Sequence, residues 1–228
     1  MAMTAVLAAG CLAVTAAAVM AVHGELVRKP TAAELSRAAA TAVARRWQAW
    51  PAGKIFPASL PYVTNLEVPE HASRVGIDPA NGCAAAVDAT VAAVLRRYGC
   101  LGVLRANYLD QREGVVFTVG VVAFPGDRAA AAARSQLRAA STSGLRALAI
   151  PKTASAWFSD RARQAATMAL SGPYIVLTTA GYSDGRPAAA TGERRPAAFA
   201  PASQLAGLVL VRLAAPALPR CGEPGWTC

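Results

Sequence analysis

The pattern of apolar and polar positions separates an uncharged opening run from a longer region of mixed elements. Residues 1–22 contain no Asp, Glu, Lys or Arg, and Glu25, Arg28 and Lys29 follow directly. A helix rising about 1.5 Å per residue crosses a hydrocarbon core of roughly 30 Å within such a run. We therefore predict a transmembrane signal anchor over 1–22. Cleavage after Ala21, which has the small-residue pattern of a signal-peptidase site, would instead give a secreted protein.

The next apolar pattern has helical spacing. Thr31 and Glu34 are three residues apart, as in a capping box, which predicts a helix that begins there. Pro51 should end it, because proline cannot continue the helical hydrogen-bond pattern. Trp47 and Trp50 share one face of this helix, and they would either pack on the domain or rest at the membrane surface.

A proline-rich segment follows this helix. Residues 51–61 (PAGKIFPASLP) contain three prolines and a glycine, a composition typical of a loop or linker. We therefore expect three parts: the transmembrane signal anchor over 1–22, a juxtamembrane helix with a Pro-rich linker over 23–61, and a domain over 62–228.

Beyond residue 61, strand patterns alternate with helical ones. Strands are expected over 62–68, 101–109, 114–124, 145–150, 163–170 and 173–181, although 163–170 also fits a helix. Helices are expected over 84–97, 127–140 and 201–215, the last packed against the sheet rather than spanning a membrane. Short polar turns between successive strands favour hairpins. We predict an α+β fold, in which an N-terminal transmembrane helix precedes an antiparallel sheet with helices packed on one face.

Four cysteines lie outside the opening run: Cys83, Cys100, Cys221 and Cys228. An even number in an exported chain predicts two disulfides, and the alternative is four separate thiols. If the helix over 84–97 is continuous, Cys83 and Cys100 lie more than about 20 Å apart, whereas a disulfide needs Cα atoms within roughly 7 Å. We therefore expect the C-terminal tail to be joined to at least one of them.

The charge of the chain is strongly positive. Lys and Arg number 23 against 13 Asp and Glu, for a net charge of +10. The pairs Arg45-Arg46 and Arg96-Arg97 would attract anionic lipid or an anionic cell-wall polymer, and the alternative is surface charge without a partner. Nucleic acid is not expected as a partner, because aromatic residues for base stacking are only 6% of the chain.

Several segments together resemble a group of small actinobacterial proteins. They are Cys83, Gly99-Cys100, LRANYLD at 104–110, VVFTVGVVAFP at 115–125 and GPYIVLTTAGYSDGR at 172–186. The resemblance implies a signal anchor and an extracytoplasmic domain. These proteins have no assigned activity, so the resemblance implies no catalytic residue.

The one motif that suggests catalysis is Gly181-Tyr182-Ser183-Asp184-Gly185, which matches the G-x-S-x-G nucleophile elbow. A serine hydrolase would need His71 as its base, since His23 lies beside the opening run. An elbow leads directly into a helix, but Pro187 follows here, so we interpret Ser183 as part of a turn.

The sequence offers few residues for other kinds of catalysis or for cofactor binding. The carboxylates Glu67, Glu70, Asp78 and Asp88 cluster in the sequence without defining an acid–base pair. The sequence has no P-loop, no dinucleotide fingerprint and no metal-binding cluster, so neither a cofactor nor a metal is expected. We therefore expect a membrane-anchored extracytoplasmic domain with a non-enzymatic binding, sensing or accessory role at the cell envelope. The alternative is a secreted or anchored serine hydrolase using Ser183 and His71.

Overall fold

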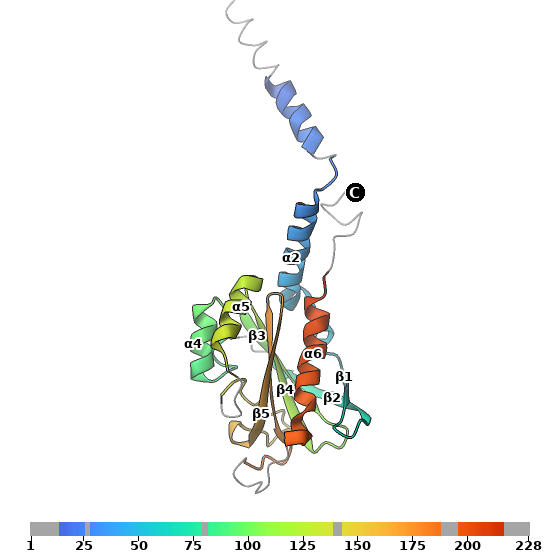
Figure 1. The fold of residues 1–228 in the computed structure, drawn as a ribbon, viewed down its shortest axis with the longest axis vertical. Helices are drawn as coiled ribbons and strands as arrows, with labels where there is room; N and C mark the ends of the chain where they lie inside the picture. The colour runs from blue at the N-terminus through green and yellow to red at the C-terminus, as the bar shows by residue number, and fades with distance from the viewer. Residues whose placement is uncertain (1–13, 26–27, 79–81, 139–142, 188–195, 217–228) are drawn as a thin grey trace, which may run out of the picture. The chain divides into compact units, whose positions relative to one another are not determined.

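The computed structural model describes residues 14–25, 28–78, 82–138, 143–187 and 196–216 (Figure 1). Residues 40–216 form one compact unit, and the described residues before Ala40 belong to a separate one. Residues 14–25 are helical and exposed. Residues 1–13 of the predicted anchor, like Cys221 and Cys228, lie outside the described residues, so the anchor stays a prediction.

Helix α2 (Ala32–Ala49) begins at the predicted capping box. The Glu34 N–H donates to Thr31 Oγ1 at 3.3 Å, and the Thr31 N–H donates to Glu34 Oε2 at 2.8 Å. The Arg28 guanidinium also donates to the Glu34 carboxylate and, as the largest cause, lowers the pKa of that carboxyl. The capping-box prediction is confirmed.

The expected loop over 51–61 is instead structured. Helix α3 (Ala52–Ile55) occupies its first half, and strand β1 begins within its second half. Ile55 and Phe56 are buried in the core, which is the physical reason that this segment folds against the sheet.

The sheet contains six antiparallel strands in the order β1-β2-β3-β4-β6-β5. They are β1 (Ser59–Val63), β2 (Pro69–Asp78), β3 (Gly102–Leu109), β4 (Val115–Ala123), β5 (Arg163–Ser171) and β6 (Tyr174–Tyr182). The hairpins β3–β4 and β5–β6 confirm the sequence prediction. The strand expected over 62–68 is mostly the turn between β1 and β2, and β2 itself was not expected.

Helices cover both faces of this sheet rather than one. Val121 and Val122 are neighbours in β4, so their side chains point to opposite faces, and each belongs to a separate buried cluster. Every residue of β4 is buried, so both of its faces need a cover. This corrects the prediction that helices pack on one face only; the α+β class and the antiparallel sheet are confirmed.

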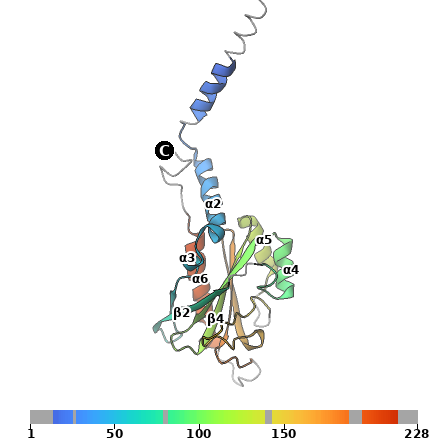
Figure 2. The ribbon, with the colours of Figure 1, turned by 180° about the vertical axis from the view of Figure 1, so that it is seen from behind.

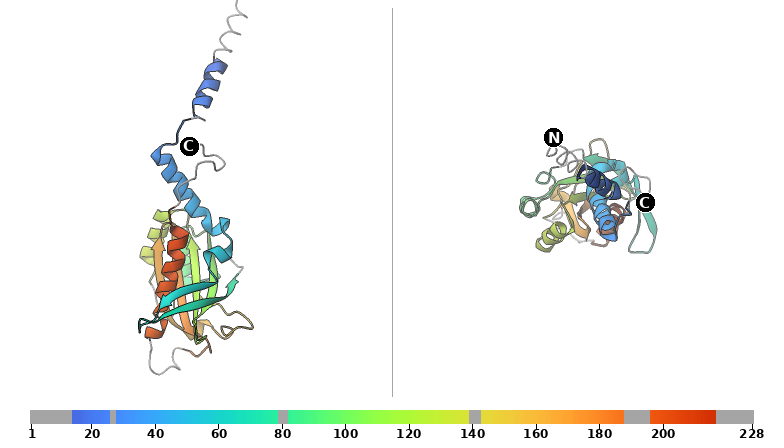
Figure 3. Two further views of the ribbon diagram at one scale, coloured as in Figure 1. Left: turned by 90° about the vertical axis from the view of Figure 1, so that its right-hand side faces the viewer. Right: turned by 90° about the horizontal axis from the view of Figure 1, so that it is seen from above.

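The first face, which we call the helix face, is covered by α2, α3 and α6 (Pro201–Ala214). Figure 2 shows α3 beside α6, and Figure 3 shows α6 running along the sheet, where it contacts β5 and β6. Among the described residues, only the helix Pro196–Ala214 is long and apolar enough to cross a membrane, and 44% of its apolar window is buried inside the fold. Its packing confirms that the segment 201–215 covers the sheet.

The second face carries helices α4 (Ala89–Arg97) and α5 (Asp127–Gln136) together with an irregular segment, residues 143–162, which we call the strap. We call this face the strap face. The expected strand over 145–150 lies in the strap and forms only an isolated bridge from Leu145 to Val87. A Cβ atom at Gly120 would come within 2.5 Å of Leu145 Cδ1, and one at Gly181 would overlap the Ala162 carbonyl oxygen. Glycines in the strands therefore let the strap lie close to the sheet.

Polar side chains of the sheet hold the backbone of the strap. The buried Asn107 amide donates to the Leu148 carbonyl oxygen and accepts from Thr118 Oγ1 at 2.6 Å. Thr118 Oγ1 in turn accepts from the Leu148 N–H at 3.1 Å. The buried Arg163 guanidinium donates to Leu145 O at 3.2 Å and to Asp88 Oδ2 at 2.7 Å. Backbone groups that lack partners within the strap thus find them on the sheet.

Candidate functional site

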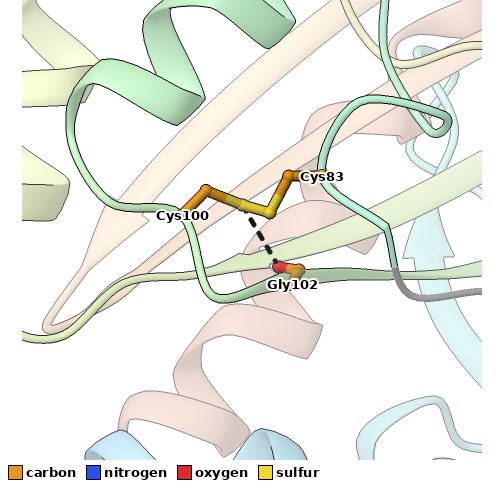
Figure 4. The surroundings of a disulfide bond; sticks show 3 residues. All are labelled: Cys83, Cys100 and Gly102. Carbon is orange, nitrogen blue, oxygen red and sulfur yellow. Dashed lines mark hydrogen bonds between the residues drawn. A yellow bond between two sulfur atoms is a disulfide. The ribbon is translucent and has the colours of Figure 1, made fainter.

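A disulfide joins Cys83 to Cys100 on the strap face, with a Cα–Cα distance of 6.4 Å and a sequence separation of 17 (Figure 4). Both residues pack against the buried cluster below α4 and α5. Cys100 Sγ also lies 3.7 Å from the Gly102 carbonyl oxygen. The described domain therefore contains one covalent crosslink.

The expectation that these two cysteines do not pair is wrong. Helix α4 begins at Ala89 rather than at residue 84, because Asp88 accepts from the Gly144 N–H and from Arg163. Residues 83–86 form a turn instead. After the helix, Gly99 adopts a φ of +74° and the chain reverses, so that the Cys100 N–H donates to Leu95 O at 2.9 Å. Since both sulfurs are used, the C-terminal tail is not joined to either of them.

The structure does not bring Ser183 and His71 together. His71 is exposed on β2, and Ser183 follows β6 in a turn. Strands β3 and β4 lie between these two, which puts the residues on the order of 14 Å apart at about 4.8 Å per strand. The Ser183 N–H donates to Gly114 O at 3.0 Å, and residues 185–187, the last described ones of this segment, are not helical. The G-x-S-x-G match thus has neither a neighbouring histidine nor the backbone of an elbow.

Three of the four candidate carboxylates are engaged in structural contacts. Glu70 accepts from the Tyr62 hydroxyl at 2.6 Å; burial first, and then this carboxylate, raise the pKa of Tyr62. Asp78 pairs with Arg105 at 2.5 Å, and Asp88 pairs with Arg163 at 2.7 Å. Glu67 lies in the β1–β2 turn with a φ of +60°. No two of these groups form a sheltered acid–base pair.

A cleft lies between α2 and the start of α5 and has a volume of about 630 Å³. Its apolar lining includes the buried Trp47 and Phe124, and Leu101 is half exposed there. Its polar lining consists of Thr41, Arg45, Gln48 and Asp127. A concave apolar surface with a few polar groups at its rim is the usual form of a small-ligand site.

Helix α2 is fixed beside this cleft by Tyr174 of β6. The Tyr174 hydroxyl donates to Val43 O at 2.6 Å and accepts from the Trp47 N–H at 3.3 Å. Burial is the main cause that raises the pKa of Tyr174, so the hydroxyl stays protonated and able to donate. Helix α2, which forms one wall of the cleft, is thus fixed to the sheet by hydrogen bonds.

Of the four arginines in the two predicted pairs, Arg46 differs from the other three. Arg46 is buried, and its guanidinium donates to Leu213 O at 2.8 Å and to Ala215 O at 2.5 Å, at the C-terminus of α6. It therefore satisfies carbonyl groups that the helix leaves open and is not presented to an external anion. Arg45, Arg96 and Arg97 are exposed.

The sequence did not indicate the cleft, because its lining comes from the middle of α2 and from the ends of β3 and β4. Within the described ranges, no group of three or more His, Cys, Asp or Glu residues is placed to hold a metal ion. Comparisons with protein-family models, curated proteins and solved structures find no match for this chain.

Proposed function

We propose that the chain is a membrane-anchored extracytoplasmic protein with a non-enzymatic binding, sensing or accessory role at the cell envelope. The observation that carries this proposal is the disulfide between Cys83 and Cys100. Disulfides persist in oxidising compartments outside the cytoplasm and are rare inside it. The uncharged run over 1–22 supplies the export signal and the membrane anchor that such a location requires.

A binding role, rather than catalysis, is supported by the described side chains. The groups that a hydrolase would need are kept apart, since His71 lies on β2, Ser183 follows β6, and β3 and β4 lie between these strands. The cleft beside α2 has the size and the mixed apolar and polar lining of a ligand site. The proposed partners are anionic lipid or an anionic cell-wall polymer, attracted by exposed arginines such as Arg45, Arg96 and Arg97.

The location is tested on the full chain in intact cells. Alkylation without reduction should leave Cys83 and Cys100 unlabelled, and labelling after reduction should reach both. The variant Cys83→Ser is the matched control, because its free Cys100 should be labelled without reduction. The chain should also stay in the membrane fraction after carbonate extraction and be cut by protease added to spheroplasts. Labelling of both cysteines in unreduced wild-type protein would overturn the proposed location.

Catalysis is tested separately with a fluorophosphonate probe that labels activated serines. The wild-type protein and Ser183→Ala should give the same background signal. Labelling of wild-type protein that is lost in Ser183→Ala would replace the binding role with the hydrolase.

A further inference from the structure

We propose that one end of the compact unit binds the anionic headgroups of the lipid membrane in which the chain is anchored. This proposal rests on the proposed anchor and names the surface that makes the contact. The surface, which we call the basic end, carries five exposed arginines: Arg45, Arg96, Arg97, Arg128 and Arg212.

The strand register places Arg96, Arg97 and Arg128 near one another. Gly102 at the start of β3 pairs with Ala123 at the end of β4, and Ala123 also pairs with Tyr174 next to the β5–β6 turn. Arg96 and Arg97 precede this point at the end of α4, and Arg128 follows it in the first turn of α5. These three side chains therefore belong to the same end of the sheet.

The last turn of α6 brings the remaining arginines to this end. A Cβ atom at Gly172, in the β5–β6 turn, would lie 3.8 Å from Ala214 Cβ and 3.7 Å from Asp127 Oδ1. Arg46 contacts the last carbonyl groups of α6, which places its neighbour Arg45 and the nearby Arg212 there as well. Figure 1 shows α2, the start of α5 and the last turn of α6 at this end.

Charge is unbalanced at the basic end. Among the described carboxylates of the compact unit, Asp127 is the exposed one at this end, and Asp78 on β2 is paired with Arg105. At the opposite end, exposed acids (Glu67, Glu113, Asp184) accompany exposed bases (Arg112, Arg161, Arg186). An anionic surface would therefore attract one end of the unit and not the other.

Apolar side chains lie among these arginines. Leu101 is 50% exposed, Leu170 beside the β5–β6 turn 39%, and Val211 in the last turn of α6 70%. Exposed apolar groups next to basic groups suit the membrane interface, where headgroups pair with the charges and the apolar groups enter the acyl boundary. A soluble polyanion would use the arginines but would leave these apolar side chains in water.

The position of the basic end in the chain supports the lipid as the partner. Only residues 23–39 separate the uncharged run from the compact unit. A tether of this length keeps the unit at a high effective concentration next to the bilayer, so weak contacts suffice. Each arginine near an anionic surface is expected to raise the equilibrium constant for binding by about fivefold.

The test uses the full chain in nanodiscs of neutral lipid and in nanodiscs that contain phosphatidylglycerol. Hydroxyl-radical footprinting with mass spectrometry measures the oxidation rates of Leu101 and Val211, with Leu66 at the opposite end as an internal control. Leu66 is 78% exposed. Oxidation of Leu101 and Val211 should slow several-fold in anionic discs, and Leu66 should not change. The protection should disappear in about 1 M NaCl, where the Debye length is about 3 Å.

The variant Arg96→Gln/Arg97→Gln should lose most of this protection, whereas the matched variant Arg112→Gln/Arg161→Gln should keep it. Equal oxidation rates in both kinds of disc, or equal effects of the two variants, would overturn the proposal. Protection in neutral discs by an added polyglycerol-phosphate polymer, exceeding that in anionic discs, would assign the surface to a polymer instead. Failure of the chain to enter discs at all would overturn the anchor, and with it the proposed function.

Discussion

The two faces of the sheet are covered in different ways. On the helix face, α6 satisfies its own backbone hydrogen bonds and contributes apolar side chains such as Leu205 and Val209. On the strap face, an irregular segment depends on Asn107, Thr118 and Arg163 for its backbone partners. A helix can cover a sheet with few specific requirements, whereas an irregular segment needs polar partners and glycines at defined positions.

The sharpest test of this comparison makes the same substitution on each face. Gly181→Ala places a methyl group against the Ala162 carbonyl oxygen and the Phe158 ring, so we expect a loss of about 3 kcal/mol in the free energy of unfolding. Gly207→Ala on α6 meets no atom within 4 Å and improves helix propensity, so a gain of about 1 kcal/mol is expected. Urea denaturation measures both changes. Equal effects would show that the strap does not lie close to the sheet.

The disulfide is a second feature of the strap face. Removing it with Cys83→Ser/Cys100→Ser should lower the free energy of unfolding by about 3 kcal/mol, because the bond closes a loop of 17 residues in the unfolded chain. Thermal melts with and without reductant provide the measurement. The wild-type protein should lose stability on reduction, and the double variant should not respond. A reductant effect that persists in the double variant would assign the loss to the other cysteines.

Buried polar groups on the two faces allow a further comparison, in which smaller changes in the free energy of unfolding are expected. Asn107→Ala removes the partner of the Leu148 carbonyl oxygen, and we expect a loss of about 2 kcal/mol. Thr178 is also buried, on the helix face, but its hydroxyl has no hydrogen-bond partner among the described residues. Thr178→Val should therefore be neutral or stabilise the domain by up to about 1 kcal/mol. Chemical denaturation of both variants tests the pair, and a strongly destabilised Thr178→Val would reveal a bound water or an unseen partner.

The smallest expected effect depends on pH. Burial alone would raise the pKa of Asp160, but the Ala147 N–H, the Arg146 guanidinium and the charge of Arg163 outweigh it and lower that pKa. A carboxyl whose pKa is lower in the folded state stabilises the protein above its unfolded value of about 3.9, and this contribution is lost as pH falls through the folded value. Stability below about pH 4 should therefore fall less steeply in Asp160→Asn. Identical slopes for both proteins would contradict the role of Asp160.

Local signals made the most reliable sequence predictions. Thr31 and Glu34 start α2 because both partners of the capping box lie within one turn. The β3–β4 hairpin was predictable because two apolar strands flank a short polar turn, which fixes their register. The segment of α6 was predictable from its length and apolar content.

Long-range contacts account for the failures. The alanines before Asp88 favour a helix, yet Asp88 binds Gly144 and Arg163, which are distant in sequence, and α4 therefore starts at Ala89. The predicted helix over 84–97 had placed Cys83 and Cys100 too far apart to form a disulfide. The apolar pattern over 145–150 predicted a strand, but the position of the strap depends on Asn107 and Thr118 from another part of the chain. The arginines of the basic end come from four helices (α2, α4, α5 and α6), and the cleft combines α2 with residues beside β3 and β4, so no single segment indicates either.

Arg46 has a mechanical consequence. Its guanidinium joins α2 to the last turn of α6, so the first and last segments of the compact unit meet at one point. A force applied to the chain ahead of residue 40 would therefore reach α6 through this guanidinium and strand β6 through the Tyr174 hydroxyl. The first and last helices of the compact unit would thus share such a load with the central sheet instead of separating from it one at a time.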